Sequence, residues 1–178
     1  MIPAARRVRA DEGARVRELR LRAVRDPNAA LAFLTTYEQE IARDPAFWDA
    51  RAASGASGDA GAMFVVETEG EWAGSATVLA RRAGDVDHTG RRRSASHAGI
   101  VGVFVDPAHR GSGAIDALLD AAADWARAQG FETLSLDVHV DNGRAQAAYR
   151  RAGFVATGEE FTTSIGRELA MTRSLRTR

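Results

Sequence analysis

The stretch Val105-Asp-Pro-Ala-His-Arg-Gly-Ser-Gly113 decides the fold of this 178-residue chain. It ends an apolar run, Ile100 to Val105, which predicts a buried strand that stops before Pro107. An amphipathic pattern from Gly113 to Gln129 predicts that a helix follows directly. Glycines at such a turn let a ligand approach the backbone, and the first N–H groups of the helix have no partner within it. We therefore expect a diphosphate to bind there.

The residues after this helix predict a second strand beside the first. Apolar and polar side chains alternate from Leu134 to Val140, which is the pattern of a strand with two different faces. A strand, a helix and a second strand in one sheet form a right-handed parallel crossover. Asn142 to Ala152 then predicts a short helix, closed by Gly153 in a left-handed conformation.

The flanking segments predict antiparallel strands and early helices, so the fold class is α+β, with one mixed sheet in a single domain over residues 1–178. The polar segment from Arg81 to His97 is too long for a tight turn and is expected to be a mobile loop. The other expected elements are a strand from Val8, a helix from Val16 to Val24, a helical segment from Asn28 to Ala42, a helix from Asp44 to Ala52, a flexible stretch from Ala53 to Gly61, and strands at 63–68, 72–79, 154–160 and 169–174.

The composition excludes several classes of function. The chain has 24 basic and 24 acidic residues and no net charge, which removes the general electrostatic argument for a nucleic-acid partner. It contains no cysteine and no lysine, so thiolate chemistry, Schiff bases and Walker-type phosphate binding are excluded.

No secretory signal or membrane-spanning run is present, and a cytoplasmic location is expected. The histidines His88, His97, His109 and His139 lack metal-site spacing, so no metal is expected.

At this point the segment from Ile100 to Phe154 resembles the GNAT superfamily of N-acetyltransferases. The family's pyrophosphate loop has Gln or Arg, two residues, Gly, one residue, then Gly or Ala, and the chain reads Arg110-Gly-Ser-Gly113-Ala-Ile115. Ile115 departs from the small residue of that pattern. The resemblance implies a mostly antiparallel twisted sheet with a splayed parallel strand pair at its centre. It also implies that the diphosphate of acetyl-CoA, the acyl donor, is held by Arg110, Gly111, Ser112, Gly113, Ala114 and Ile115.

A second part of the resemblance covers the segment from Leu136 to Phe154, where Asn142, Ala145, Tyr149 and Gly153-Phe154 have the family's spacing. It implies that Asn142 lies on the pantetheine side and that Tyr149 hydrogen-bonds the leaving sulfur. It further implies that the pantetheine arm pairs like an added strand with Val103, Phe104 and Val105. A tyrosine of pKa about 10 is a weaker acid than a thiol near 8.5, so Tyr149 is expected to donate a hydrogen bond rather than transfer its proton fully.

The acceptor amine must lose a proton before it attacks, and several side chains are candidates for the base. Asp137 precedes Tyr149 by 12 residues, where ribosomal-protein N-acetyltransferases, which this segment resembles, carry a glutamate base. Aspartate is shorter, so a bridging water is expected. His139 has a suitable reference pKa, and Glu38 or Glu40 could recognise the amine or relay protons.

The resemblance implies acetyl transfer to a primary amine by direct attack in a ternary complex. The acceptor, a small molecule or a protein N-terminus, is not specified by any motif, and homodimers are common among similar families. No nucleic-acid or membrane partner is expected. Alternatives are an acyl-CoA-binding sensor without catalysis and a nucleotide-dependent transferase.

Two groups of arginines have two possible positions each. Arg91 to Arg93 could be solvated or contact an acidic acceptor, and Arg150 and Arg151 could reach the adenosine phosphates or lie on an exposed helix face.

Overall fold

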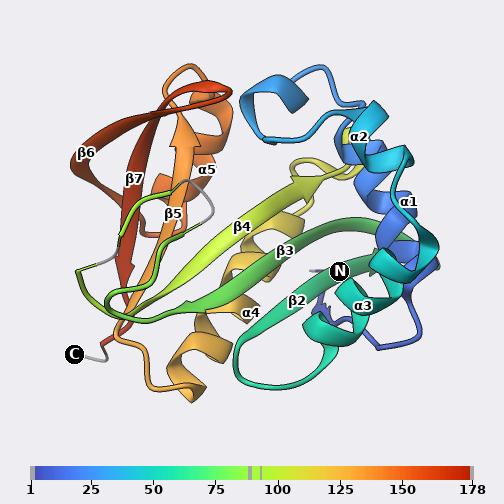
Figure 1. Ribbon diagram of the computed structural model, residues 1–178, viewed down its shortest axis with the longest axis horizontal. Coiled ribbons are helices and arrows are strands. Elements are labelled where there is room, and N and C mark those ends of the chain that lie inside the picture. The colour runs from blue at the N-terminus through green and yellow to red at the C-terminus, as the bar shows by residue number, and fades with distance from the viewer. Residues whose placement is uncertain (1–2, 88–89, 93, 177–178) are drawn as a thin grey trace.

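A seven-stranded sheet organises the chain in the computed structural model, which describes residues 3–87, 90–92 and 94–176 (Figure 1). The strand order is β1-β2-β3-β4-β5-β7-β6, and only the neighbours β4 and β5 are parallel. The strands are β1 (Ala5–Arg7), β2 (Gly61–Thr68), β3 (Glu71–Arg81), β4 (His97–Val105), β5 (Thr133–His139), β6 (Val155–Thr163) and β7 (Gly166–Ser174). The helices are α1 (Gly13–Ala23), η1 (Ala29–Leu31), α2 (Tyr37–Ile41), α3 (Pro45–Ala56), η2 (Pro107–His109), α4 (Ala114–Ala128) and α5 (Gly143–Arg151).

The parallel pair at the centre of the sheet is short. Ala98 pairs with Leu134 and Gly99 with Ser135, and the pairing of β4 with β5 ends there. The two strands are joined through α4, so the predicted strand-helix-strand crossover is confirmed. Beyond Gly99 the edge of β4 that faces β5 has no strand partner, so its backbone N–H and C=O groups can bind a ligand.

A β-bulge in β4 accounts for the divergence of the two strands. Thr77 of β3 pairs with Val101, whereas Ser75 pairs with Phe104, so β4 carries one extra residue between these two pairs. Gly102 lies inside the bulge with φ of 63°, a left-handed conformation that glycine adopts without the steric cost of a Cβ atom. A bulge bends its strand and increases the local twist, which turns β4 away from β5.

Helices cover the two faces of the sheet (Figure 1). The first face packs against α4 and α5, with Leu118 and Leu119 fully buried beside Leu136 and Met171. Each buried leucine contributes about 1.5 to 3 kcal/mol of transfer free energy. The opposite face of β2 and β3 packs against α1 and α3, around Trp48. The described helices include none that is long and apolar enough to cross a membrane.

Most element predictions are confirmed, and the differences have local causes. The helix predicted from Asn28 to Ala42 is two pieces, η1 and α2, because Thr36 begins a new helix through a capping box with Gln39. The stretch from Ala53 to Gly61 was expected to be flexible, but α3 continues to Ala56. The first strand ends just before Val8, whose N–H still donates to the Met63 carbonyl at 2.9 Å.

Candidate functional site

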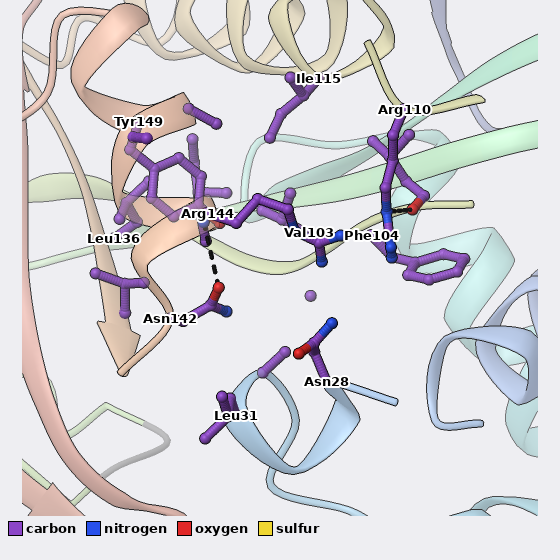
Figure 2. A pocket seen from close by; sticks show the side chains of 18 of the residues that line it. Asn28, Leu31, Val103, Phe104, Arg110, Ile115, Leu136, Asn142, Arg144 and Tyr149 are labelled. Carbon is purple, nitrogen blue, oxygen red and sulfur yellow. Dashed lines mark hydrogen bonds between the residues drawn. The ribbon is translucent and has the colours of Figure 1, made fainter. Parts of the chain in front are cut away.

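A cavity of about 480 Å³ lies where β4 and β5 diverge, beneath the N-terminus of α4 and beside α5 and η1 (Figure 2). It is lined by nearly all of the residues that the sequence singled out: Val103, Phe104, Val105, Arg110, Gly111, Gly113, Ala114, Ile115, Asp137, Asn142 and Tyr149. Ser112 is exposed beside the cavity and does not line it; its hydroxyl donates to the His109 carbonyl at 2.6 Å.

The end of the cavity at α4 is built from backbone amides. Gly111 and Gly113 have φ of 77° and 86°, the left-handed conformation in which successive N–H groups form an anion-binding nest. The N–H groups of residues 111–116 donate to no acceptor in the described part of the chain. A Cβ added at Gly111 would meet nothing within 4 Å, so the turn has room on that side. A diphosphate therefore fits this end in geometry and in charge.

Arg110 is at the same end, but its guanidinium is engaged by the protein. Its Nη2 atom donates to the carboxylate of Asp26, just after α1, and its Nε donates to the Val105 carbonyl at 3.1 Å. Burial acts to raise the pKa of Asp26, yet the backbone N–H of Asn28 and the Arg110 guanidinium lower that pKa overall. Arg110 thus ties the turn to the first helical region, and its charge is paired with that of Asp26.

Arg144, which the sequence reasoning did not single out, also lines the cavity. Its side chain reaches from the first turn of α5 into the open space (Figure 2). It is exposed and forms no hydrogen bond or ion pair with another described residue, although its charge helps to lower the pKa of Asp26. An arginine two residues after Asn142 carries no signal by itself, since exposed arginines are usually solvated.

Tyr149 and Asn142 lie on the α5 side of the cavity (Figure 2). Tyr149 is buried, and desolvation raises the pKa of its hydroxyl to about 12. The hydroxyl therefore stays protonated at neutral pH and is available as a donor. Asn142 caps α5 with its Oδ1 atom, which accepts from the Ala145 N–H at 3.2 Å. The cap fixes the orientation of the amide and leaves its NH₂ group for a ligand.

Asp137 reaches the cavity from β5, but it is not a free carboxylate. Arg91, from the segment between β3 and β4, donates to its Oδ2 atom at 2.8 Å. The same guanidinium pairs with Glu159 at 2.8 Å and with Asp87 at 3.5 Å, and it lies 3.4 Å from the centre of the Phe161 ring. Arg91, the first residue of the arginine run, thus joins the segment between β3 and β4 to β5 and β6.

The other candidates for proton transfer are less well placed. The His139 ring lines the cavity, but its Nδ1 atom accepts from the Asp141 N–H at 3.1 Å, so the neutral ring carries its proton on Nε2. Glu40 is fully buried between Arg20 and Arg43 at 2.9 and 2.7 Å, where it holds the early helices together. Glu38 is exposed on α2 and does not line the cavity.

Other basic side chains are distributed between the cavity and the surface. Arg151 lines the cavity, whereas Arg150 is exposed and donates to Gln146 at 3.0 Å. Arg93 and His88, both considered above, lie outside the described residues. Among the residues that are described, no cluster of histidine and acidic side chains could hold a metal ion.

Comparisons with known proteins agree on one family. The family model described as the Acetyltransferase (GNAT) family matches residues 20–154. The chain is 35% identical over 98 residues to an aminoglycoside N(6')-acetyltransferase type 1 of Stenotrophomonas maltophilia, a match that covers 54% of this chain and 61% of that relative. The matched part is therefore less than two thirds of that relative's length.

Two solved structures have a similar fold over nearly the whole chain. An acetyltransferase of the GNAT family from Streptococcus pneumoniae is 20% identical, with a TM-score of 0.73 and coverage of 97% of this chain and 98% of that one. A phosphinothricin acetyltransferase from Sinorhizobium meliloti, solved in complex with acetyl-CoA, is 19% identical, with a TM-score of 0.74 and coverage of 98% and 89%. At these identities the similarity establishes the fold alone.

Proposed function

Because the chain belongs to the GNAT acetyltransferase family, whose model matches residues 20–154, we propose that it transfers an acetyl group from acetyl-CoA to a primary amine. The amine attacks directly in a ternary complex, and residues 1–178 act as one acetyltransferase domain. The observation that carries the proposal is the run of unpaired backbone amides at residues 111–116, which opens on the cavity that also holds Tyr149.

The cofactor-binding residues follow from this geometry. The amides from Gly111 to Ile115 would hold the diphosphate, with positive charge from Arg144, while Arg110 holds the turn that carries these amides. Ser112 takes part through its backbone N–H, since its hydroxyl is bonded elsewhere. The unpaired edge of β4 from Val103 to Val105 would pair with the pantetheine arm as a strand does, and the Asn142 amide would face it. Acetyl-CoA supplies the activated acyl group.

Tyr149 stabilises the charge that develops on the leaving sulfur. With a pKa of about 12, its hydroxyl is far less acidic than a thiol near 8.5, so complete proton transfer is uphill by about 5 kcal/mol. We therefore assign Tyr149 a hydrogen bond to the developing thiolate. A backbone N–H on the splayed edge of β4 faces the thioester oxygen and stabilises the negative charge that forms there.

The acceptor amine reaches the cavity as an ammonium ion. An amine of pKa about 10 is unprotonated to about one part in a thousand at pH 7, which corresponds to about 4 kcal/mol. Asp137 is the proposed proton acceptor, through a bridging water. Because Arg91 binds its Oδ2 atom at 2.8 Å, Asp137 can accept a proton through that oxygen only when the loop arginine moves.

The name of one relative supports a class of acceptor. The Stenotrophomonas maltophilia relative is named for an aminoglycoside, a cationic molecule with several amines, and it supports an amine acceptor of that type.

The second candidate function is an acyl-CoA sensor that binds its ligand without turnover. Ile115 favours it, because this bulky side chain stands where the family has a small residue.

Ligand-induced thermal stabilisation tests the cofactor assignment. At about 100 times its Kd, a ligand raises the free energy of unfolding by about 2.7 kcal/mol. We expect acetyl-CoA to raise the melting temperature well above the values measured with ATP or NAD. A larger effect of ATP or NAD would instead assign the turn to a nucleotide-dependent enzyme. Release of CoA with added amines then separates an enzyme from a sensor.

A further inference from the structure

A buried carboxylate on β7 is not used by the mechanism above. Glu168 is 8% exposed, and it lines the cavity. Its side chain forms no hydrogen bond or ion pair with any residue that the structure describes. Its carboxylate oxygens are not fully enclosed and meet solvent only within the cavity, so a ligand that enters the cavity meets a negative charge that no cation of the described residues neutralises. Such a group is retained most easily where a ligand supplies the missing positive charge.

The other buried acidic side chains of the described chain show how unusual this is. Glu12 is bound by Arg6 at 2.7 Å, and Glu40 by Arg20 at 2.9 Å. Buried Asp87 likewise pairs with a cation, the loop arginine described above. The protein thus neutralises its buried acids with arginine, and Glu168 differs from them in facing the cavity without one.

The strand register places the Glu168 side chain on the face of the sheet opposite α4, which is also the face of the proposed base Asp137. It pairs with His139 of β5, whereas Asp137 pairs with Ala170, so all four side chains point to the same face of the sheet. Leu136 and the other residues of opposite parity pack against α4 on the other face. The cavity is lined from both faces and so passes between β4 and β5, with the phosphate end on the α4 side.

The position of Glu168 is offset from the gap where the reaction takes place. β7 lies beyond β5, so Glu168 is displaced from the β4–β5 gap by about one strand spacing, ~5 Å. Three titratable groups lie around it on the neighbouring strands. His139 is opposite on β5, and the carboxylates of Asp137 on β5 and Glu159 on β6 are both paired with Arg91. On β6 it pairs with Phe161, which is apolar. Its negative charge is the one in this group without a cation.

We propose that Glu168 binds a second, non-reacting ammonium group of the acceptor, so that the site selects amines carrying two or more amino groups. The ammonium and the carboxylate form a charge-assisted hydrogen bond inside the cavity, while the other amine of the same molecule lies in the β4–β5 gap. This inference rests on the proposed acetyl transfer and names the acceptor class for it.

Matched amines test the assignment through binding, without relying on turnover. The probes are 1,3-diaminopropane, 1,4-diaminobutane and 1,5-diaminopentane, each compared with the monoamine of the same length, with CoA present. We expect at least one diamine to stabilise the wild-type protein more than its monoamine. In Glu168→Gln, which keeps the size of the side chain, that diamine should bind about 10- to 100-fold more weakly, the loss expected for one charged hydrogen bond.

Two controls separate recognition from damage to the fold. Glu160→Gln, an exposed carboxylate on β6 that pairs with Arg167, should keep the preference for the diamine. Glu168→Gln should melt at nearly the same temperature as wild type, because it keeps the size of the side chain and removes no ion pair or hydrogen bond with a described residue. The assignment is wrong if no diamine binds better than its monoamine, or if the preference persists in Glu168→Gln. Stabilisation by acetyl-CoA is measured in the same samples, so failure of the proposed function would be seen separately.

Discussion

The guanidinium of Arg110 binds the carboxylate of Asp26 at the phosphate end of the cavity, and these two residues lie 84 positions apart in the chain. The contact joins the Gly-rich turn to the segment after α1. Arg144 projects into the same cavity with no such partner among the described residues. We therefore propose that the two arginines differ in function, with Arg110 holding the turn in place and Arg144 binding a phosphate.

We expect substitutions of these two arginines to separate stability from affinity. Arg110→Gln removes the guanidinium that is hydrogen-bonded to Asp26 and should lower the free energy of unfolding by about 1 to 3 kcal/mol. Arg144→Gln should leave stability nearly unchanged and weaken acetyl-CoA binding about tenfold. Urea denaturation and calorimetry measure the two effects. The reverse pattern would show that Arg110 is the phosphate ligand and Arg144 is not.

Gly113→Asp should weaken acetyl-CoA binding, because its carboxylate would stand beside the amides that we propose hold the diphosphate. Aspartate at φ of 86° also carries backbone strain, so the control needs a glycine of similar conformation away from the cavity. Gly58→Asp, at φ of 81° with open space around it, meets this need. Unchanged cofactor affinity in a folded Gly113→Asp protein would move the diphosphate site elsewhere.

Tyr149→Phe removes one hydroxyl and little volume, so folding and cofactor affinity should change little. Loss of the hydrogen bond to the leaving sulfur should lower the single-turnover rate by about 10²- to 10⁴-fold. Because the pKa of Tyr149 is about 12, the defect should be the same from pH 7 to pH 9, where the hydroxyl remains protonated. A fully active Tyr149→Phe enzyme would exclude this residue from the chemical step.

Acid should destabilise the protein partly through Glu12. Its hydrogen bond with Arg6, opposed by burial and helped by the Arg9 N–H, lowers the pKa of Glu12 from 4.5 to about 2. The stability it contributes is present above the unfolded pKa and is lost as the pH falls from about 4.5 toward 2. Glu12→Gln should cost about 1 to 2 kcal/mol at pH 7 and almost nothing at pH 2. An equal cost at both pH values would contradict this, as measured by urea denaturation.

The central part of the fold could be predicted from sequence because its signals are local. The strand before Pro107 and the helix after Gly113 are each specified by a few adjacent residues, and so is the cap at Asn142. The early helices were harder to predict. The hydrophobic periodicity of residues 28–42 indicates one helix, but the capping box at Thr36 begins a new one.

The site's charged contacts could not be predicted in the same way, because they join distant segments. Arg91 meets Asp137 across 46 positions, and no property of the arginine run shows which carboxylate it will bind. Glu168 has an ordinary place in an alternating strand, and its isolation appears only when β5, β6 and β7 are assembled. The single extra residue at Gly102, which opens the cavity, likewise depends on the register of β3.

Acetyl transfer itself is the most direct test of the account. The purified protein is incubated with acetyl-CoA and, in turn, aminoglycosides, diamines, monoamines and a peptide with a free N-terminus, and CoA release and acetylated product are measured together. We expect equal amounts of CoA and N-acetylated amine with at least one acceptor, and no acetyl group left on the protein. Tight binding of acetyl-CoA with no acetylated product from any amine would contradict the proposed enzyme and leave the acyl-CoA sensor as its function.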